Sequence, residues 1–142
     1  MAPAAQTSSE LTRARVPQAL RILIADDERD TVLTLIELLR EDGHETRGVY
    51  KGSDAIAAAR DFDPDAVLLD IAMPDMNGWD VARELRRIYG DSRPVLIAIS
   101  GIYRQSADKI LGMLAGFNYY LSKPYDPNVL LTLLRAGTPE DA

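Results

Sequence analysis

Five polar residues of this sequence follow directly on short apolar runs, and their side chains suit the binding of hard metal ions and phosphate. These residues are Asp26, Asp27, Asp70, Ser100 and Lys123. In a sheet of parallel strands, ligands bind beyond the carboxyl ends of the strands. The positions of these residues therefore predict one binding site, provided that the strands they follow lie next to one another.

Three carboxylates at close range repel one another, so all three stay ionised only if a cation shares the site. A site of oxygen ligands with positions open to water and phosphate suits Mg²⁺ best. The Lys123 ammonium fits beside such a cation only with an anion between them, and a phosphoryl group would supply that anion. Asp70 is the natural carboxylate nucleophile for forming an aspartyl phosphate.

Each residue taken alone has a plainer interpretation. An Asp after a strand is often a turn former or a helix cap, and a lone Ser or Lys at a strand end is usually a solvated loop residue. The occurrence of all five at corresponding strand ends favours the site.

The elements that must position these residues alternate along the chain, as in a parallel sheet covered by helices on both faces. We expect strands at Arg21–Ala25, Glu45–Val49, Ala66–Leu69, Val95–Ile99 and Tyr119–Ser122. We expect helices from about Asp30 to Glu41, from Ser53 or Asp54 to before Asp63, at Trp79–Tyr89, at about Ser106–Leu114 and at Pro127–Ala136.

This pattern predicts the α/β fold class, as a flavodoxin-like, doubly wound, five-stranded parallel sheet of order 2-1-3-4-5 with five helices. In that order the first and third strands are neighbours, so Asp26, Asp27 and Asp70 meet at one edge. We expect residues 1–19 to form a flexible tail, residues 20–136 one domain, and residues 137–142 a second tail.

Composition narrows the function further. The net charge of −6 and the pI near 4.7 argue against a nucleic-acid-binding surface. No cysteine is available for thiolate metal sites or thiol nucleophiles, and His44 is the single histidine. The apolar runs are too short to span a bilayer, and the N-terminus lacks the order of a signal peptide. We therefore expect a cytoplasmic protein that does not bind a membrane.

Four segments together resemble the receiver domains of two-component response regulators, over about Arg21 to Arg135. They are Ile24-Ala25-Asp26-Asp27-Glu28, Leu68-Leu69-Asp70-Ile71-Ala72-Met73-Pro74-Asp75-Met76-Asn77-Gly78, Ile97-Ala98-Ile99-Ser100-Gly101 and Tyr120-Leu121-Ser122-Lys123-Pro124.

The resemblance implies a role for each of these residues. Asp70 would be the phosphoacceptor. Asp27 would bind Mg²⁺ directly, Asp26 directly or through water, and the backbone carbonyl of Ala72 would complete the protein ligands.

The resemblance also implies residues that respond to phosphorylation. Ser100 would bond the phosphoryl group and move inward, and Tyr120 would be the aromatic switch residue that follows it. The Lys123–Pro124 peptide bond would be cis and would aim the lysine at the phosphoryl group. Before proline, the cis isomer lies only slightly above the trans isomer in free energy.

The function expected on this basis is that of a phosphoacceptor switch rather than an enzyme. It would take a phosphoryl group from a histidine kinase or a histidine phosphotransfer protein, and would signal by binding a partner or by passing the phosphate on. A phosphorylation-dependent dimer is one form that this output could take.

Two other functions fit parts of this pattern. A phosphohydrolase or phosphomutase with an aspartyl-phosphate intermediate usually carries a second acid two positions after the nucleophile, and here that residue is Ala72. A pseudo-receiver would bind its partners without phosphorylation. The sequence favours neither a stand-alone regulator nor a piece of a hybrid kinase decisively, although Met1 and the polar C-terminal segment incline toward the former.

Overall fold

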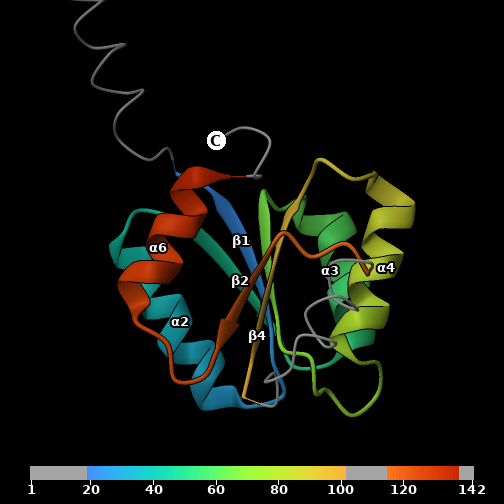
Figure 1. Ribbon diagram of the computed structural model, residues 1–142, viewed down its shortest axis with the longest axis horizontal. Coiled ribbons are helices and arrows are strands. Elements are labelled where there is room, and N and C mark those ends of the chain that lie inside the picture. Colours follow the sequence, from blue (N-terminus) through green and yellow to red (C-terminus); the bar gives the residue numbers. More distant parts are fainter. Residues whose placement is uncertain (1–18, 102–114, 138–142) are drawn as a thin grey trace, which may run out of the picture.

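The fold is a parallel sheet between two layers of helices (Figure 1). The computed structural model describes residues 19–101 and 115–137. The described strands are β1 (Arg21–Ala25), β2 (Glu45–Val49), β3 (Ala66–Leu69), β4 (Val95–Ser100) and β5 (Tyr119–Ser122). The helices whose bounds are described are α2 (Arg29–Glu41), α3 (Gly52–Phe62), α4 (Gly78–Tyr89) and α6 (Pro127–Ala136).

The sheet has the predicted order, β2-β1-β3-β4-β5, and every pair of neighbouring strands is parallel. Ala25, the last residue of β1, lies level with Val49 on one side and with Leu69 on the other. The carboxyl ends of the central strands therefore meet at one edge of the sheet, as the sequence predicts.

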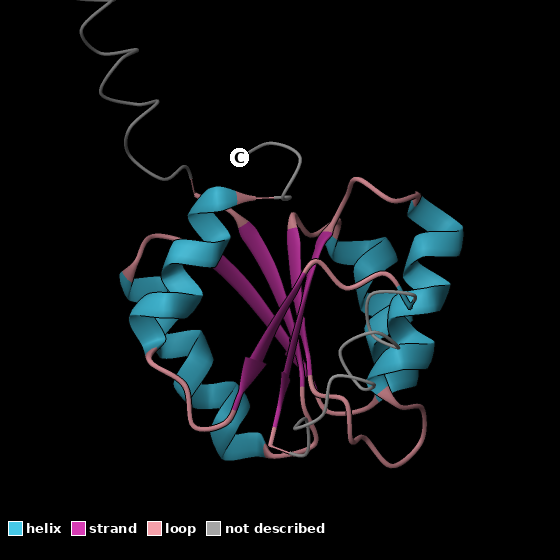
Figure 2. Cartoon of the chain, in the orientation of Figure 1, coloured by secondary structure: helices cyan, strands magenta, loops and turns pink. Residues whose placement is uncertain are grey.

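The core is divided by the sheet into two clusters, because successive strand residues point to opposite faces. In β1, Leu23 packs with the cluster beneath α3 and α4, whereas Ile22 and Ile24 pack with the cluster beneath α2 and α6. Figure 2 shows these two pairs of helices on opposite faces of the sheet. All four residues of β3 are buried, as expected for a central parallel strand.

Most element bounds agree with the prediction, but α3 begins differently. It starts at Gly52, and its N-cap residue Lys51 makes no side-chain cap hydrogen bond. The sequence predicts a start near Ser53 or Asp54, residue types that often cap their own helix. Here the capping carboxylate instead comes from Asp75, a residue distant in sequence.

Several predictions concern residues outside the described ranges 19–101 and 115–137. The helix expected at about Ser106–Leu114 and nearly all of the two predicted tails lie outside the described residues. The division into one domain and two tails stays a prediction. None of the helices in the described part of the chain has the length and apolar character that a membrane span requires.

Strand β5 carries two neighbouring tyrosines on opposite faces of the sheet. Tyr120 packs with the cluster beneath α3 and α4, and its ring centroid lies 5.5 Å from that of Phe117. Tyr119 packs with the opposite cluster, and its hydroxyl donates a 2.6 Å hydrogen bond to the carbonyl of Gly137, which caps α6. One strand thus contacts both layers through adjacent residues.

Arg86 of α4 joins three segments at the amino edge of the sheet. Its guanidinium donates to the carbonyl oxygens of Gly116 at 2.9 Å and Pro94 at 2.8 Å, and to Oδ1 of Asn118 at 2.8 Å. Oδ1 of Asn118 also accepts the backbone N–H of Leu96. The planar, multiply donating guanidinium is the one side chain with the geometry for this set of acceptors.

We predict that Arg86→Met lowers the free energy of unfolding by about 1–3 kcal/mol, because the carbonyl and amide oxygens lose charged donors while the aliphatic stem is kept. Urea unfolding measures this change. Arg87→Met is the control, because Arg87 forms an exposed ion pair with Glu84 on the same helix, and such pairs contribute little. Equal urea midpoints for Arg86→Met and wild type would contradict the prediction.

Candidate metal centre

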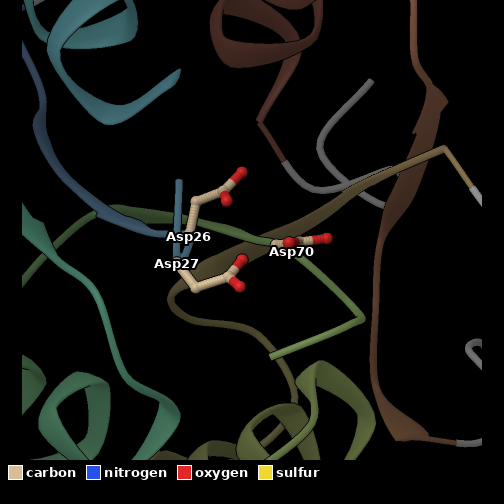
Figure 3. A group of neighbouring side chains, drawn as sticks. All are labelled: Asp26, Asp27 and Asp70. Carbon is tan, nitrogen blue, oxygen red and sulfur yellow. The ribbon is translucent and has the colours of Figure 1, made fainter. Parts of the chain in front are cut away.

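Three carboxylates meet where β1 and β3 end. Asp26 and Asp27 follow β1, Asp70 follows β3, and one carboxylate oxygen of each lies within 4.8 Å of those of the other two. Asp26 and Asp70 are buried, whereas Asp27 is exposed. Figure 3 shows the three side chains next to one another, with those of Asp26 and Asp27 extending toward the side on which Asp70 lies. The structure thus brings together the three acids that the sequence predicts to meet.

Backbone hydrogen bonds hold these acids in place. The N–H of Asp26 donates to the carbonyl of Val49 at 3.2 Å, and the N–H of Asp70 donates to that of Ala25 at 2.9 Å. The strand ladder therefore extends to Asp26 and Asp70, so the sheet sets the Cα positions of these two acids.

Local turns then orient two of the carboxylates. Oδ1 of Asp26 accepts the N–H of Glu28 at 2.9 Å, and Oδ1 of Asp70 accepts the N–H of Ala72 at 3.3 Å. Each carboxylate bonds the amide two residues ahead, the pattern that Asp commonly forms in turns.

Lys123 reaches this cluster from the end of β5. Its Nζ lies 3.2 Å from Oδ2 of Asp26 and 3.6 Å from Oε1 of Glu28. Its backbone N–H donates to the carbonyl of Ser100 at 3.2 Å, and its peptide bond to Pro124 is cis, the form that the resemblance implies.

Burial and the charges in the cluster shift two pKa values. Burial raises the pKa of the Asp70 carboxyl group to about 6, and the Asp26 carboxylate adds to the rise, while Lys123 and the Ala72 amide oppose it. Burial by itself would lower the pKa of Lys123, but the Asp26, Asp70 and Glu28 carboxylates outweigh it and raise that pKa. At Asp70, burial and the neighbouring carboxylates therefore outweigh the effect of the lysine.

This donor set fits a small, hard cation. Its side-chain donors are carboxylate oxygens, and the exposed Asp27 leaves the site open to water. Mg²⁺ prefers a few carboxylates together with water or phosphate oxygens. Asp26, Asp27 and Asp70 would hold such an ion, and its charge would favour the ionised form of Asp70.

Two further predicted residues lie on neighbouring strands. Ser100 is buried at the end of β4 and level with Ser122 of β5. Tyr120 is half-buried and level with Ala98, two residues before Ser100. Ser100 is thus at the same sheet edge as the acids, and Tyr120 lies one step back toward the core.

Sequence reasoning missed how tightly the loop after Asp70 is folded. A Cβ atom at Gly78 would lie 2.6 Å from the Asp70 carbonyl oxygen, so no side chain fits there. The amide of Gly78 donates to the carbonyl of Ile71 at 2.9 Å, which closes the loop. The loop's turn-rich composition was visible in the sequence, but its return to Asp70 was not.

The chain is similar to curated response regulators. It is 38% identical over 117 residues to Protein PilH of Pseudomonas aeruginosa, a match that covers 82% of this chain and 95% of PilH. It is also 38% identical over 116 residues to the DNA-binding response regulator MtrA of Mycolicibacterium smegmatis. That match covers 82% of this chain and 49% of MtrA, so the chain spans about half the length of such relatives.

The name of MtrA describes that protein as DNA-binding, so the expectation that this chain does not bind nucleic acid stays a prediction.

Solved structures agree on the fold. The activated receiver domain of Klebsiella pneumoniae RstA superposes with a TM-score of 0.76 at 24% identity, over 82% of this chain and 97% of that one. A CheY-like receiver domain from Methanospirillum hungatei superposes with a TM-score of 0.74 at 24% identity, covering 81% and 90%.

The sequence model of the response regulator receiver domain matches residues 22–135. This region includes all five strands, apart from Arg21 at the start of β1. The acids, the serine and the lysine lie in this matched region, at the carboxyl edge of the sheet. The chain therefore belongs to the family of response regulator receiver domains.

Proposed function

We propose that this chain is a phosphoacceptor switch in which Asp70 receives a phosphoryl group from a histidine kinase or a histidine phosphotransfer protein. The observation that carries the proposal is the meeting of Asp26, Asp27 and Asp70 within 4.8 Å, with the Lys123 ammonium beside them. Acids alone would suit a cation site, whereas acids with a lysine suit a cation and an anion together.

In the transfer, a carboxylate oxygen of Asp70 attacks the phosphorus atom and forms a P–O bond. The P–N bond to the donor's imidazole breaks, and its electron pair goes to the imidazole nitrogen. Asp70 must be ionised to attack, and the Lys123 charge and the Ala72 amide both favour its ionised form.

The remaining residues receive the transferred charge. Lys123 and the Ser100 hydroxyl would each contact a phosphoryl oxygen, which spreads the negative charge over donors that the fold already holds in place. Mg²⁺, when bound, supplies the positive charge that lets the phosphoryl group approach the acids. Asp26 and Asp27 would hold the ion, together with the Ala72 carbonyl.

The output would be a population shift, because the phosphoryl group need only bind one arrangement of the site better than another. Ser100 would move toward the phosphoryl group, and Tyr120, on the neighbouring strand, would follow. The chain would then signal by binding a partner, dimerisation included, or by passing the phosphate on. We place this activity in the cytoplasm, where histidine kinases present their phosphohistidine.

A groove of about 450 Å³ next to the site offers a place for the donor to dock. It runs between α2 and the turn from β5 to α6, and Lys123 forms part of its wall. Its lining residues are Asp30, Thr31, Thr34, Leu35, Leu38, Lys123, Pro124, Tyr125 and Pro127. This largely apolar lining suits one face of an amphipathic helix, and a donor helix seated there would present its histidine beside Lys123.

We predict that acetyl phosphate with Mg²⁺ adds one phosphoryl group to the wild-type chain and none to Asp70→Asn, because the amide has no nucleophilic carboxylate oxygen. Intact-mass measurement detects the added group. Omitting Mg²⁺ is the second control and should abolish the gain.

A folded wild-type protein that gains no phosphoryl group from acetyl phosphate or from any phosphohistidine donor would refute the switch. The pseudo-receiver, which binds partners without phosphorylation, would then be the better description.

We predict that, without Mg²⁺, the ionisation of Asp70 destabilises the folded state. Its pKa of about 6 lies above the ordinary value of 3.8, so the folded state binds more protons than the unfolded state. The free energy of unfolding therefore falls as the pH rises through about 4 to 6, by on the order of 1–3 kcal/mol. Asp70→Asn lacks this loss. Urea unfolding in EDTA at about pH 5 and about pH 7.5 measures the difference.

Added Mg²⁺ should restore the stability of the wild type at the higher pH and leave Asp70→Asn nearly unchanged. An advantage of Asp70→Asn over wild type that does not grow with pH would contradict the assigned cause.

We predict that Thr34→Arg slows phosphotransfer from a protein donor about tenfold, because a long charged side chain fills the groove; tenfold is equivalent to about 1.4 kcal/mol. The donor is any histidine kinase or phosphotransfer protein that phosphorylates the wild type. Leu33→Arg is the matched control, since Leu33 is exposed on the same helix but does not line the groove. Phosphorylation by acetyl phosphate should be equal in all three chains, and a uniform loss would count against docking.

A further inference from the structure

Asp75 lies in the loop between β3 and α4 and binds the first turn of α3. Its Oδ1 accepts the N–H of Gly52 at 2.9 Å, and its Oδ2 accepts the N–H and the hydroxyl of Ser53 at 3.0 and 2.7 Å. These bonds lower the pKa of the Asp75 carboxyl group well below its usual range. Asp75 is therefore an ionised cap supplied to α3 by a different segment of the chain, where the helix dipole favours negative charge.

The same helix turn and loop are also in direct contact. A Cβ atom at Gly52 would lie 2.2 Å from the carbonyl oxygen of Met76 and 2.9 Å from its Cβ. Only glycine permits this approach, and the approach brings the Gly52 amide within reach of Asp75. The cap and the contact fix the middle of the loop against α3.

The two ends of the loop are fixed to Asp70. At the start, the Ala72 N–H donates to Oδ1 of Asp70 at 3.3 Å. At the other end, Gly78 packs on the Asp70 carbonyl and donates its amide to Ile71. Asp75 stands between these attachments, three residues after Ala72, and its bonds to α3 hold the loop at a point between its two ends.

We propose that Asp75 is a positioning residue for the metal centre. By holding the loop on α3, it keeps the Ala72 amide on the Asp70 carboxylate and so keeps that carboxylate directed toward Asp26 and Asp27. Asp75 does not itself contact the acids. The inference rests on the proposed function for the identity of the ion, Mg²⁺, but it concerns the geometry of the unphosphorylated site.

A purely structural role is the competing explanation, in which Asp75 caps α3 and its loss only destabilises the fold. The two explanations differ in what else should change. A positioning role alters Mg²⁺ affinity and the surroundings of the Ala72 amide in protein that is still folded, whereas a cap alone alters only the free energy of unfolding.

Asp65 provides a matched control. Its Oδ2 accepts the backbone N–H of Arg21 at 2.9 Å, and its Oδ1 forms an ion pair with Arg93. Like Asp75 it is a loop carboxylate that ties two segments together, but it lies before β3, at the opposite end of the strand from Asp70. Asp65→Ala therefore removes a comparable tie without touching the loop after Asp70.

The experiment measures Mg²⁺ binding by calorimetry in the full unphosphorylated chain, with the amide resonance of Ala72 as a second readout and urea unfolding as the measure of stability. For Asp75→Ala we expect the dissociation constant for Mg²⁺ to rise about tenfold or more, as for lost outer-shell partners of metal ligands. We also expect the Ala72 resonance to shift in Mg²⁺-free protein.

Two variants serve as controls. Ser53→Ala keeps both backbone bonds to Asp75, and its dissociation constant for Mg²⁺ should stay near that of the wild type. Asp65→Ala should lose stability but keep its Mg²⁺ affinity.

Wild-type Mg²⁺ affinity in Asp75→Ala, an equal loss in Asp65→Ala, or a wild-type chain that binds no Mg²⁺ would each overturn the inference. Should Asp75→Ala fail to fold, Asp75→Asn takes its place, because its amide keeps one acceptor oxygen but no longer accepts from both backbone amides. A chain that binds Mg²⁺ as expected but takes no phosphoryl group would refute the proposed function and leave this inference standing.

Discussion

The repulsion among three carboxylates at one sheet edge is the constraint on which the rest of this molecule depends. Asp26 and Asp70 are buried beside each other, and burial of like charges is costly unless a cation joins them. The neighbouring lysine offsets only part of this cost, since the pKa of Asp70 stays raised to about 6. The protein keeps an unfavourable arrangement at this edge because the strand ladder fixes the Cα positions of the acids. The cost is electrostatic, and a bound cation would lower it.

The opposite edge of the sheet has the reverse character. There Asp65 bonds the start of β1, and Arg86 and Asn118 satisfy the backbone groups around β4 and β5. Charges at this edge are paired with donors or acceptors of matching geometry, which stabilises the fold. The amino edge of the sheet therefore contributes to stability, whereas the carboxyl edge carries carboxylates that a bound cation would neutralise.

Local pattern and the rules for parallel sheets were enough to predict the strands, their order and the acids that meet. Apolar runs mark buried strands, and the residue after each run must lie at the carboxyl edge whatever the loops do. The capping of α3 by Asp75 could not be predicted in this way. Ser53 and Asp54 offer a local cap, and only the path of a loop that lies 22 residues after Ser53 brings a different carboxylate to that helix. The close approaches at Gly52 and Gly78 likewise depend on tertiary contacts, which the sequence does not reveal.

The paired tyrosines of β5 give the edge strand a mechanical property. Tyr120 packs toward α4, and Tyr119 bonds the carbonyl that ends α6. Because side chains of adjacent strand residues project to opposite faces, a rotation of β5 about its own axis swings the two rings in opposite senses. A change in the orientation of β5 would therefore move the ring of Tyr120 on one face and the α6-capping hydroxyl of Tyr119 on the other face together.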